Sequence, residues 1–254
     1  FLLGMKVEGI ALGTLLAQYA GTGMAVWLWM RHYGRLRRRW HWRDFANRRA
    51  MTRFFAVNRN IFLRTLCLVA TTVFFTSTGA RQGDIILAVN TLLMQLFTLF
   101  SYIMDGFAYA GEALGGRYYG AGNRTAFRRM VRSLFLWGIA MAAAFTLLYV
   151  IGGQGFLGLL TDEAEVIAAS ADYHYWTLAI PLVSFTAFLL DGIFIGTTST
   201  RWMLWAIAVA SACFFLIYWL GFNRLGNHAL WLAFLVYLGM RGIMEAWLGR
   251  KLLW

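Results

Sequence analysis

The chain has 254 residues, of which 60% are hydrophobic and only 13% are charged. A soluble domain carries about 25% charged residues, so this composition leaves too few polar side chains to cover a surface in water. The net charge of +12 could indicate a nucleic-acid partner, but we expect none, because the basic residues lie in loops between apolar runs.

Seven stretches are long and apolar enough to cross a bilayer, which takes about 20 mostly apolar residues as a helix. Backbone groups in lipid must be hydrogen-bonded within the segment, so helices are predicted rather than open strands. The predicted fold class is an all-α integral membrane protein with about seven transmembrane helices. In chain order, the stretches are roughly 7–30, 61–80, 85–115, 133–152, 175–196, 202–222 and 229–248.

The chain is predicted to have three parts. Segment 1–30 is interpreted as a helix of a preceding unit. Because the chain opens on Phe1 in an apolar context without a signal-peptide pattern, we expect it to start inside a longer protein. Segment 31–60 is a basic linker with aromatic residues among its arginines. It is predicted either to lie on anionic lipid as an interfacial helix or only to set the topology. Segment 61–254 is predicted to form one six-helix bundle.

Charge in the loops predicts the orientation. The linker 31–60 and the loop near 117–132 are rich in arginine, whereas the loop near 161–172 holds four acids and no basic residue. Basic loops stay on the cytoplasmic side of a membrane. The linker and the C-terminus, with Arg250 and Lys251, are therefore predicted to be cytoplasmic.

Three of the predicted helices carry a narrow polar line on an otherwise apolar surface. At 100° per residue, the polar residues of 85–115 fall within an arc of roughly 80°. They are Asn90, Thr98, Ser101, Asp105 and Glu112. The line in 175–196 consists of Thr177, Ser184 and Asp191, and the line in 61–80 consists of Thr65, Thr72 and Thr76.

Two interpretations of these lines stay open. Serine, threonine and asparagine can join helices by hydrogen bonds across their interface. Alternatively, the lines face a water-accessible cavity for a cation and a substrate. Asp105, Glu112 and Asp191 favour the cavity, because burial favours the neutral form of a carboxylic acid, which can then bind and release a proton. Pro181, near the same line, predicts either a hinge or a static kink.

Other charged or small residues within the spans have structural interpretations. Arg241 and Glu245 are four residues apart and can pair along one helix face. Arg64 lies one turn into its span and is predicted to extend its side chain to the cytoplasmic interface. Gly192 and Gly196 form a GxxxG pair, which predicts close helix packing.

Several motifs resemble the DinF-like branch of the multidrug and toxic compound extrusion (MATE) family. They cover most of the chain: GMKVEGIALGTLLAQY at its start, NRNIFLRTL, AVNTLLMQLF, DGFAYAGEALGGRYYGAGNRTAFRR, LLTDEAEVIAASADYHYW and LLDGIFIGTTSTRW. The resemblance implies a twelve-helix, two-lobe exporter of the bacterial inner membrane. It would move organic cations and drugs outward against H+ or Na+ entry by alternating access.

In that comparison, the chain would hold helix six, the linker and the six helices of the C-terminal lobe, and its partner would be the missing N-terminal lobe. Asp191 falls on the aspartate of the tenth helix that the family uses in the cavity of this lobe. The seventh helix differs from that of some branches of the family. Those branches place an acidic residue in it, whereas this chain has threonines and Arg64 there. The N-lobe aspartate that DinF-like members use for proton coupling lies outside the chain.

Three other classes of function were weighed. A lipid-linked precursor flippase would favour a cationic cavity, whereas the cavity candidates here are acidic and the arginines are expected in cytoplasmic loops. A membrane enzyme is not expected, because His32, His41, His174 and His228 lie at span ends. Cys67 and Cys213 lie far apart in apolar runs, so neither a metal site nor a cofactor is expected. An inactive fragment is the third alternative.

Overall fold

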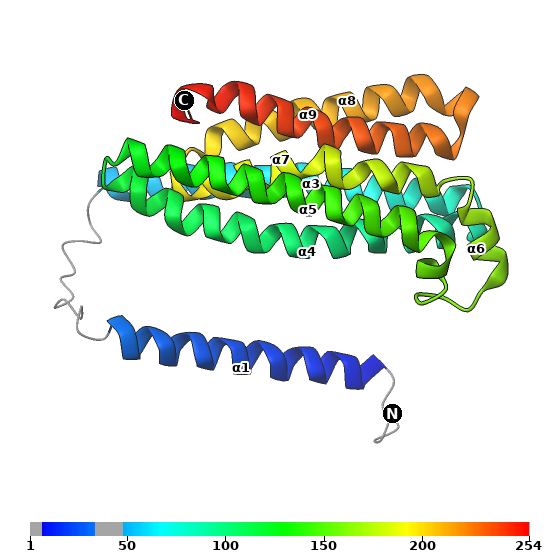
Figure 1. Ribbon diagram of the computed structural model, residues 1–254, viewed down its shortest axis with the longest axis horizontal. Coiled ribbons are helices and arrows are strands. Elements are labelled where there is room, and N and C mark those ends of the chain that lie inside the picture. The colour runs from blue at the N-terminus through cyan, green and yellow to red at the C-terminus, as the bar shows by residue number, and fades with distance from the viewer. Residues whose placement is uncertain (1–6, 34–47, 254) are drawn as a thin grey trace. The chain divides into compact units, whose positions relative to one another are not determined.

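The computed structural model describes residues 7–33 and 48–253, and these residues are helical almost throughout, with no strand among them (Figure 1). The chain divides into two compact units, Phe1–Thr52 and Arg53–Trp254. The helices in chain order are α1 (Val7–Tyr33), α3 (Arg48–Arg81), α4 (Asp84–Gly120), α5 (Arg124–Leu157), α6 (Ala164–Ser170), α7 (His174–Gly196), α8 (Thr200–Leu225) and α9 (Asn227–Leu253).

Six of the described helices are long and apolar enough to cross a membrane: α3, α4, α5 as far as Gly153, α7, α8 and α9. They correspond to the six spans predicted for 61–254, and the all-α membrane fold is confirmed. The stretch 7–30 does form a helix, α1, but it is not among the six, because glycines and Gln18 dilute its apolar residues. Its role as a seventh span stays a prediction.

The first helix of the larger unit begins earlier than the sequence indicated. α3 starts at Arg48 rather than near residue 61, so the second half of the expected linker continues directly into a membrane span. Phe54 and Phe55 lie on this continuous helix and are exposed. The rest of the expected interfacial helix, including Trp40 and Trp42, lies outside the described residues. The three-part division of the chain stays a prediction.

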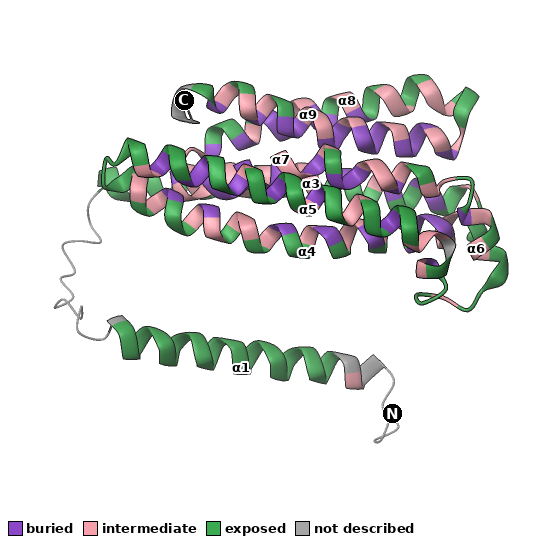
Figure 2. Cartoon of the chain, viewed as in Figure 1, coloured by how far each residue is buried: buried purple, intermediate pink, exposed green. Residues whose placement is uncertain are grey.

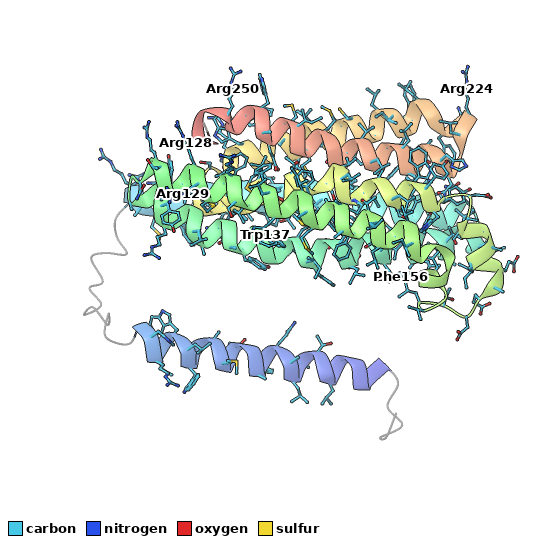
Figure 3. All side chains as sticks on the ribbon, viewed as in Figure 1. Arg128, Arg129, Trp137, Phe156, Arg224 and Arg250 are labelled. Atoms are coloured by element: carbon cyan, nitrogen blue, oxygen red, sulfur yellow. The ribbon has the colours of Figure 1, made fainter. Side chains whose placement is uncertain are left out.

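Short turns reverse the chain between successive long helices, so the larger unit has two ends. We call the end where α4 gives way to α5 the basic end, and the end that carries α6 the acidic end. Arg128, Arg129 and Arg250 extend from the basic end (Figure 3). The four acids between Asp162 and Asp172 lie at or beside α6.

α7 lies at the centre of the bundle, where it packs against α4, α5, α8 and α9. Buried residues face the neighbouring helices and exposed residues cover the outer surfaces (Figure 2). α7 and α9 are the most buried spans. A polar side chain on either helix is therefore held away from lipid by its neighbours.

α4 and α7 run in the same direction and cross very closely at small residues. A Cβ atom at Gly192 would collide with the carbonyl oxygen of Ala108, and one at Gly196 would collide with that of Glu112. The GxxxG prediction of close packing is thus confirmed for this pair. The crossing brings the similar segments DGFAYAG (105–111) and DGIFIGT (191–197) together.

Replacing Gly192 with alanine is expected to force this crossing apart. Overpacking of this kind typically lowers the free energy of unfolding by about 1–3 kcal/mol. Thermal unfolding of the complete protein in detergent measures the effect. Gly106→Ala is the matched control, because nothing lies within 4 Å of a Cβ placed at Gly106 on the same helix pair. Equal unfolding temperatures for the two variants would contradict the close approach.

Candidate functional site

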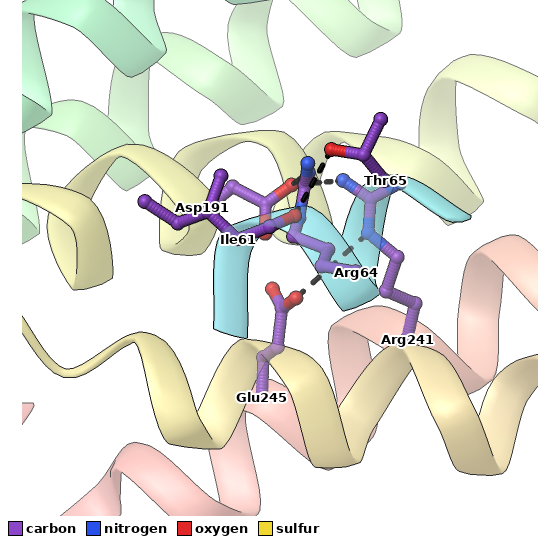
Figure 4. A network of polar contacts seen from close by, with 6 residues as sticks. All are labelled: Ile61, Arg64, Thr65, Asp191, Arg241 and Glu245. Carbon is purple, nitrogen blue, oxygen red and sulfur yellow. Dashed lines mark hydrogen bonds and ion pairs between the residues drawn. The ribbon is translucent and has the colours of Figure 1, made fainter. Parts of the chain in front are cut away.

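A cluster of four charged side chains lies inside the larger unit, toward its basic end (Figure 4). Asp191 on α7 accepts hydrogen bonds at Oδ2 from Nη2 of Arg64 on α3 and from Nη2 of Arg241 on α9. Asp191 is 6% exposed and Arg241 is 3% exposed. Charged side chains at membrane depth are costly and normally serve a function, so this cluster is the strongest candidate site.

Glu245 is the fourth member of the cluster. Its Oε1 lies 3.8 Å from Nε of Arg241, one helical turn away on α9, which confirms the predicted pair along the helix face. The contact is an ion pair without a hydrogen bond, and Glu245 is 0% exposed. The two acids and two arginines sum to zero formal charge, as expected for charges held in a medium of low dielectric constant.

The interpretation of Arg64 as an arginine that extends to the interface is wrong. Its side chain is only 17% exposed and binds Asp191. Ion pairing is much stronger in the interior than in water, so pairing with a buried carboxylate outweighs the hydration available at the surface.

Arg241 also lies over the ring of Phe188, with 5.6 Å between its Cζ and the ring centroid. Phe188 therefore adds an aromatic face to the site.

The other two candidate acids are on α4. Asp105 is partly buried, and its electrostatic neighbours are Asp191, Arg241 and Arg64. The structure thus places Asp105 within electrostatic reach of Asp191; that the two acids line one cavity stays a prediction. Glu112 is also partly buried, but no ion pair joins it to another described residue, and its backbone lies close to Gly196 of α7.

The hydroxyl groups of the polar lines mostly bond within their own helices, so they do not join helices to one another. Each donates to a backbone carbonyl three or four residues earlier: Thr72 to Leu68, Thr76 to Thr72, Thr98 to Met94, Ser101 to Thr98, Thr177 to His174 and Ser184 to Ile180. Thr177 and Ser184 are buried, whereas Thr72 and Thr76 are exposed. Whether these residues line a cavity stays a prediction.

Asn90 belongs to a different site. Its side chain exchanges two hydrogen bonds of 2.9 Å with the side chain of Asn227 and accepts a third, also 2.9 Å, from Nε1 of Trp231. All three residues are buried near the acidic end. Asn90 therefore joins α4 to α9, as the helix-joining interpretation proposed, and it lies apart from the charge cluster.

Replacing Asn90 with alanine is expected to destabilise the bundle. The change leaves the Trp231 N–H and the Asn227 amide buried without partners, and each unsatisfied group costs about 1–3 kcal/mol. Thermal unfolding in detergent measures the loss. Asn223→Ala, at an exposed position near the same end, is the control and should unfold like the native protein. A stable Asn90→Ala variant would show that water replaces the lost bonds.

Pro181 lies inside α7, which continues through it from His174 to Gly196. Proline cannot donate a backbone hydrogen bond. In the turn before it, Oγ1 of Thr146 on α5 donates to the carbonyl oxygen of Leu178 at 3.2 Å. A neighbouring helix thus supplies a donor where the backbone ladder is weakened. The prediction that Pro181 acts as a hinge stays untested.

Arg64, Arg241 and Glu245 belong to the site but were not predicted as members of it. The signal was present, because all three are ionisable residues within apolar spans. The expectation that the arginines lie in cytoplasmic loops is wrong for Arg64 and Arg241, which lie within spans and bind Asp191. Because Asp191 and Glu245 balance them, the cluster still does not form a cationic cavity.

The fold and this site define a polytopic helical membrane protein with a buried charge cluster. Residues 60–220 match the family model MatE, and the chain belongs to this family, which confirms the resemblance seen in its motifs. It is 38% identical over 250 residues to DNA damage-inducible protein F of Escherichia coli (strain K12), an alignment that covers 98% of the chain and 54% of that protein.

Two plant proteins are also similar. The chain is 23% identical over 264 residues to Protein DETOXIFICATION 42 of Arabidopsis thaliana, covering 97% of the chain and 47% of that protein. It is 20% identical over 184 residues to Protein DETOXIFICATION 44, chloroplastic, covering 72% of the chain and 35% of that protein. The chain therefore spans about half the length, or less, of the curated relatives it matches.

Proposed function

We propose that the chain is part of a secondary active exporter with two lobes. It forms one complete six-helix lobe and contributes one helix to the other lobe. The complete protein would move organic cations or drugs outward and draw energy from the entry of H+ or Na+. Membership of the MatE family and the names of the plant relatives support transport of this kind. The partner that completes the transport path would be the lobe that precedes this chain.

The observation that carries the proposal is the contact of α3, α7 and α9 at one buried carboxylate. Asp191 holds Arg64 and Arg241 by hydrogen bonds. A cation that binds among these acids competes with an arginine for the same carboxylate oxygen, so its arrival weakens the link between two helices. Differential binding of this kind is what an ion needs to shift a transporter between two conformations.

The test uses the complete protein in efflux-deficient bacteria loaded with a fluorescent organic cation. Extrusion that stops when the proton or sodium gradient is dissipated supports antiport. Extrusion that persists without either gradient would contradict it. Failure to extrude any cation tested, with the protein present in the membrane, would favour the flippase or the inactive-fragment alternative.

The proposal includes location in the bacterial inner membrane with the basic end toward the cytoplasm. In a complete protein in which Cys67 and Cys213 have been replaced by alanine, Glu163→Cys at the exposed acidic end should react with a membrane-impermeant maleimide in intact spheroplasts. Arg129→Cys at the basic end should react only after permeabilisation. The opposite pattern would invert the topology.

A further inference from the structure

The charge cluster contains buried acceptors that lack a donor. Asp191 Oδ1, Glu245 Oε1 and Glu245 Oε2 are buried and accept no hydrogen bond from any residue that the structure describes. Buried polar atoms without partners are rare, since each costs free energy. Arg64 and Arg241 both donate through Nη2 to Oδ2 of Asp191, and their buried Nε groups donate no hydrogen bond to a described residue. The hydrogen bonds from the two arginines therefore converge on one oxygen, and Glu245 and Asp191 Oδ1 receive none of them.

Glu245 and Asp191 both contact Arg241, and their carboxyl groups lie close enough to act on each other electrostatically. Two ionised carboxylates only accept hydrogen bonds, so they cannot bond to each other, whereas a protonated carboxylic acid donates one. A single proton on Glu245 would convert one of its oxygens into an O–H donor, which could bond to Asp191 Oδ1. The chemistry of the site thus fits a proton better than a metal ion, because two guanidinium groups already occupy the positive positions.

Glu245, rather than Asp191, is the group placed to take that proton. Asp191 receives two charge-assisted hydrogen bonds, which hold it in the ionised form. Glu245 has one ion pair at 3.8 Å and no exposed surface. The charged groups that act on it are Asp191 on α7, Arg64 on α3 and Arg241 on α9. The arginines of α8, Arg201 and Arg224, are exposed at its ends.

We propose that Glu245 is the carboxyl group that binds and releases the coupling proton in this lobe. The proton comes from water, converts the Glu245 carboxylate to the acid, and allows its O–H to donate to Asp191 Oδ1. This inference rests on the proposed antiport function and names its ion and its carrier.

Protonation changes the charge balance of the cluster. Before it, two acids balance two arginines; after it, Asp191 alone faces both guanidinium groups, and the cluster carries one positive charge in excess. Arg64 is the least buried member of the cluster, with a side chain that is 17% exposed, so it can move most easily toward water. Because Arg64 links α3 to α7, a proton on Glu245 loosens the contact between these two helices.

The first test is spectroscopic and needs no transport. Infrared difference spectra of the complete purified protein are recorded across a pH series, and the carbonyl stretch of protonated carboxyl groups is followed. Glu245→Gln is expected to remove one titrating band, and Glu163→Gln, a glutamate exposed at the acidic end, should leave the same band in place. An unchanged band in Glu245→Gln would overturn the proposal.

The second test separates pumping from exchange in proteoliposomes. Glutamine mimics the protonated acid, so Glu245→Gln should lose accumulation driven by a pH gradient by at least 10-fold and keep substrate exchange at zero gradient. Accumulation equal to that of the native protein would overturn the proposal. If Glu245→Gln does not fold, Glu245→Asp keeps the titrating group and should retain a shifted band. If the native protein transports nothing, the proposed function fails, while the infrared result still decides the role of Glu245.

Discussion

Replacing Asp191 with asparagine is expected to reduce gradient-driven extrusion of an organic cation by about 5- to 150-fold, the range that corresponds to a coupling free energy of 1–3 kcal/mol between linked sites. Asparagine keeps the shape of the side chain but removes the charge that holds Arg64 and Arg241. The cluster then has two arginines and one acid in place of a balanced set. The cluster in this variant is therefore expected not to respond to the binding of a proton or sodium ion.

Efflux-deficient cells that express the complete protein measure this effect as the rate of dye extrusion. Asp162→Asn, at an exposed position of the acidic end, is the matched control and should extrude at the native rate. Asp191→Glu retains the charge and should recover part of the activity. Native extrusion by Asp191→Asn, at equal protein level, would place coupling in the lobe that precedes this chain.

The second large effect concerns stability. Arg241→Met is expected to lower the free energy of unfolding by about 3–5 kcal/mol, because removal of one partner leaves a buried charge uncompensated. Arg241 contacts both acids of the cluster, Asp191 and Glu245, and methionine replaces its length without its charge. Thermal unfolding in detergent, or the fraction of protein that survives heating, measures the loss.

A double variant shows whether charge or packing causes that loss. Arg241→Met with Glu245→Gln removes one positive and one negative charge, so the remaining pair of Asp191 and Arg64 is balanced again. We expect the double variant to recover much of the lost stability. An additive loss from the two substitutions would mean that Arg241 acts through its packing on Phe188 rather than through its charge.

Much of the fold could be predicted from the sequence because a bilayer imposes simple limits on length and hydropathy. The six spans of the larger unit follow from those limits. The start of α3 does not follow from them. The segment from Arg48 to Asn60 is rich in polar residues, and hydropathy does not mark the part of a helix that extends beyond the membrane. The contacts of this segment with the start of α8, such as Asn60 with Thr200, depend on the tertiary fold.

The site was predicted only in part, for two physical reasons. The partners of Asp191 lie 127 and 50 residues away in sequence, and helical periodicity relates only residues on the same helix. Ser184, Thr98 and the other hydroxyls of the polar lines satisfy themselves on their own backbone, so a polar line does not require a polar neighbour. Asp191 and Asp105 stood out in the sequence because an ionisable side chain at membrane depth is costly.

The measurement that tests the central claim most directly is proton movement upon substrate addition. The complete protein is reconstituted in vesicles that contain a pH-sensitive dye, and an organic cation is added without any imposed gradient. We predict that the native protein moves protons opposite to the cation and that Asp191→Asn moves far fewer. Cation transport by the native protein without proton or sodium movement would contradict a coupling site at the buried charge cluster.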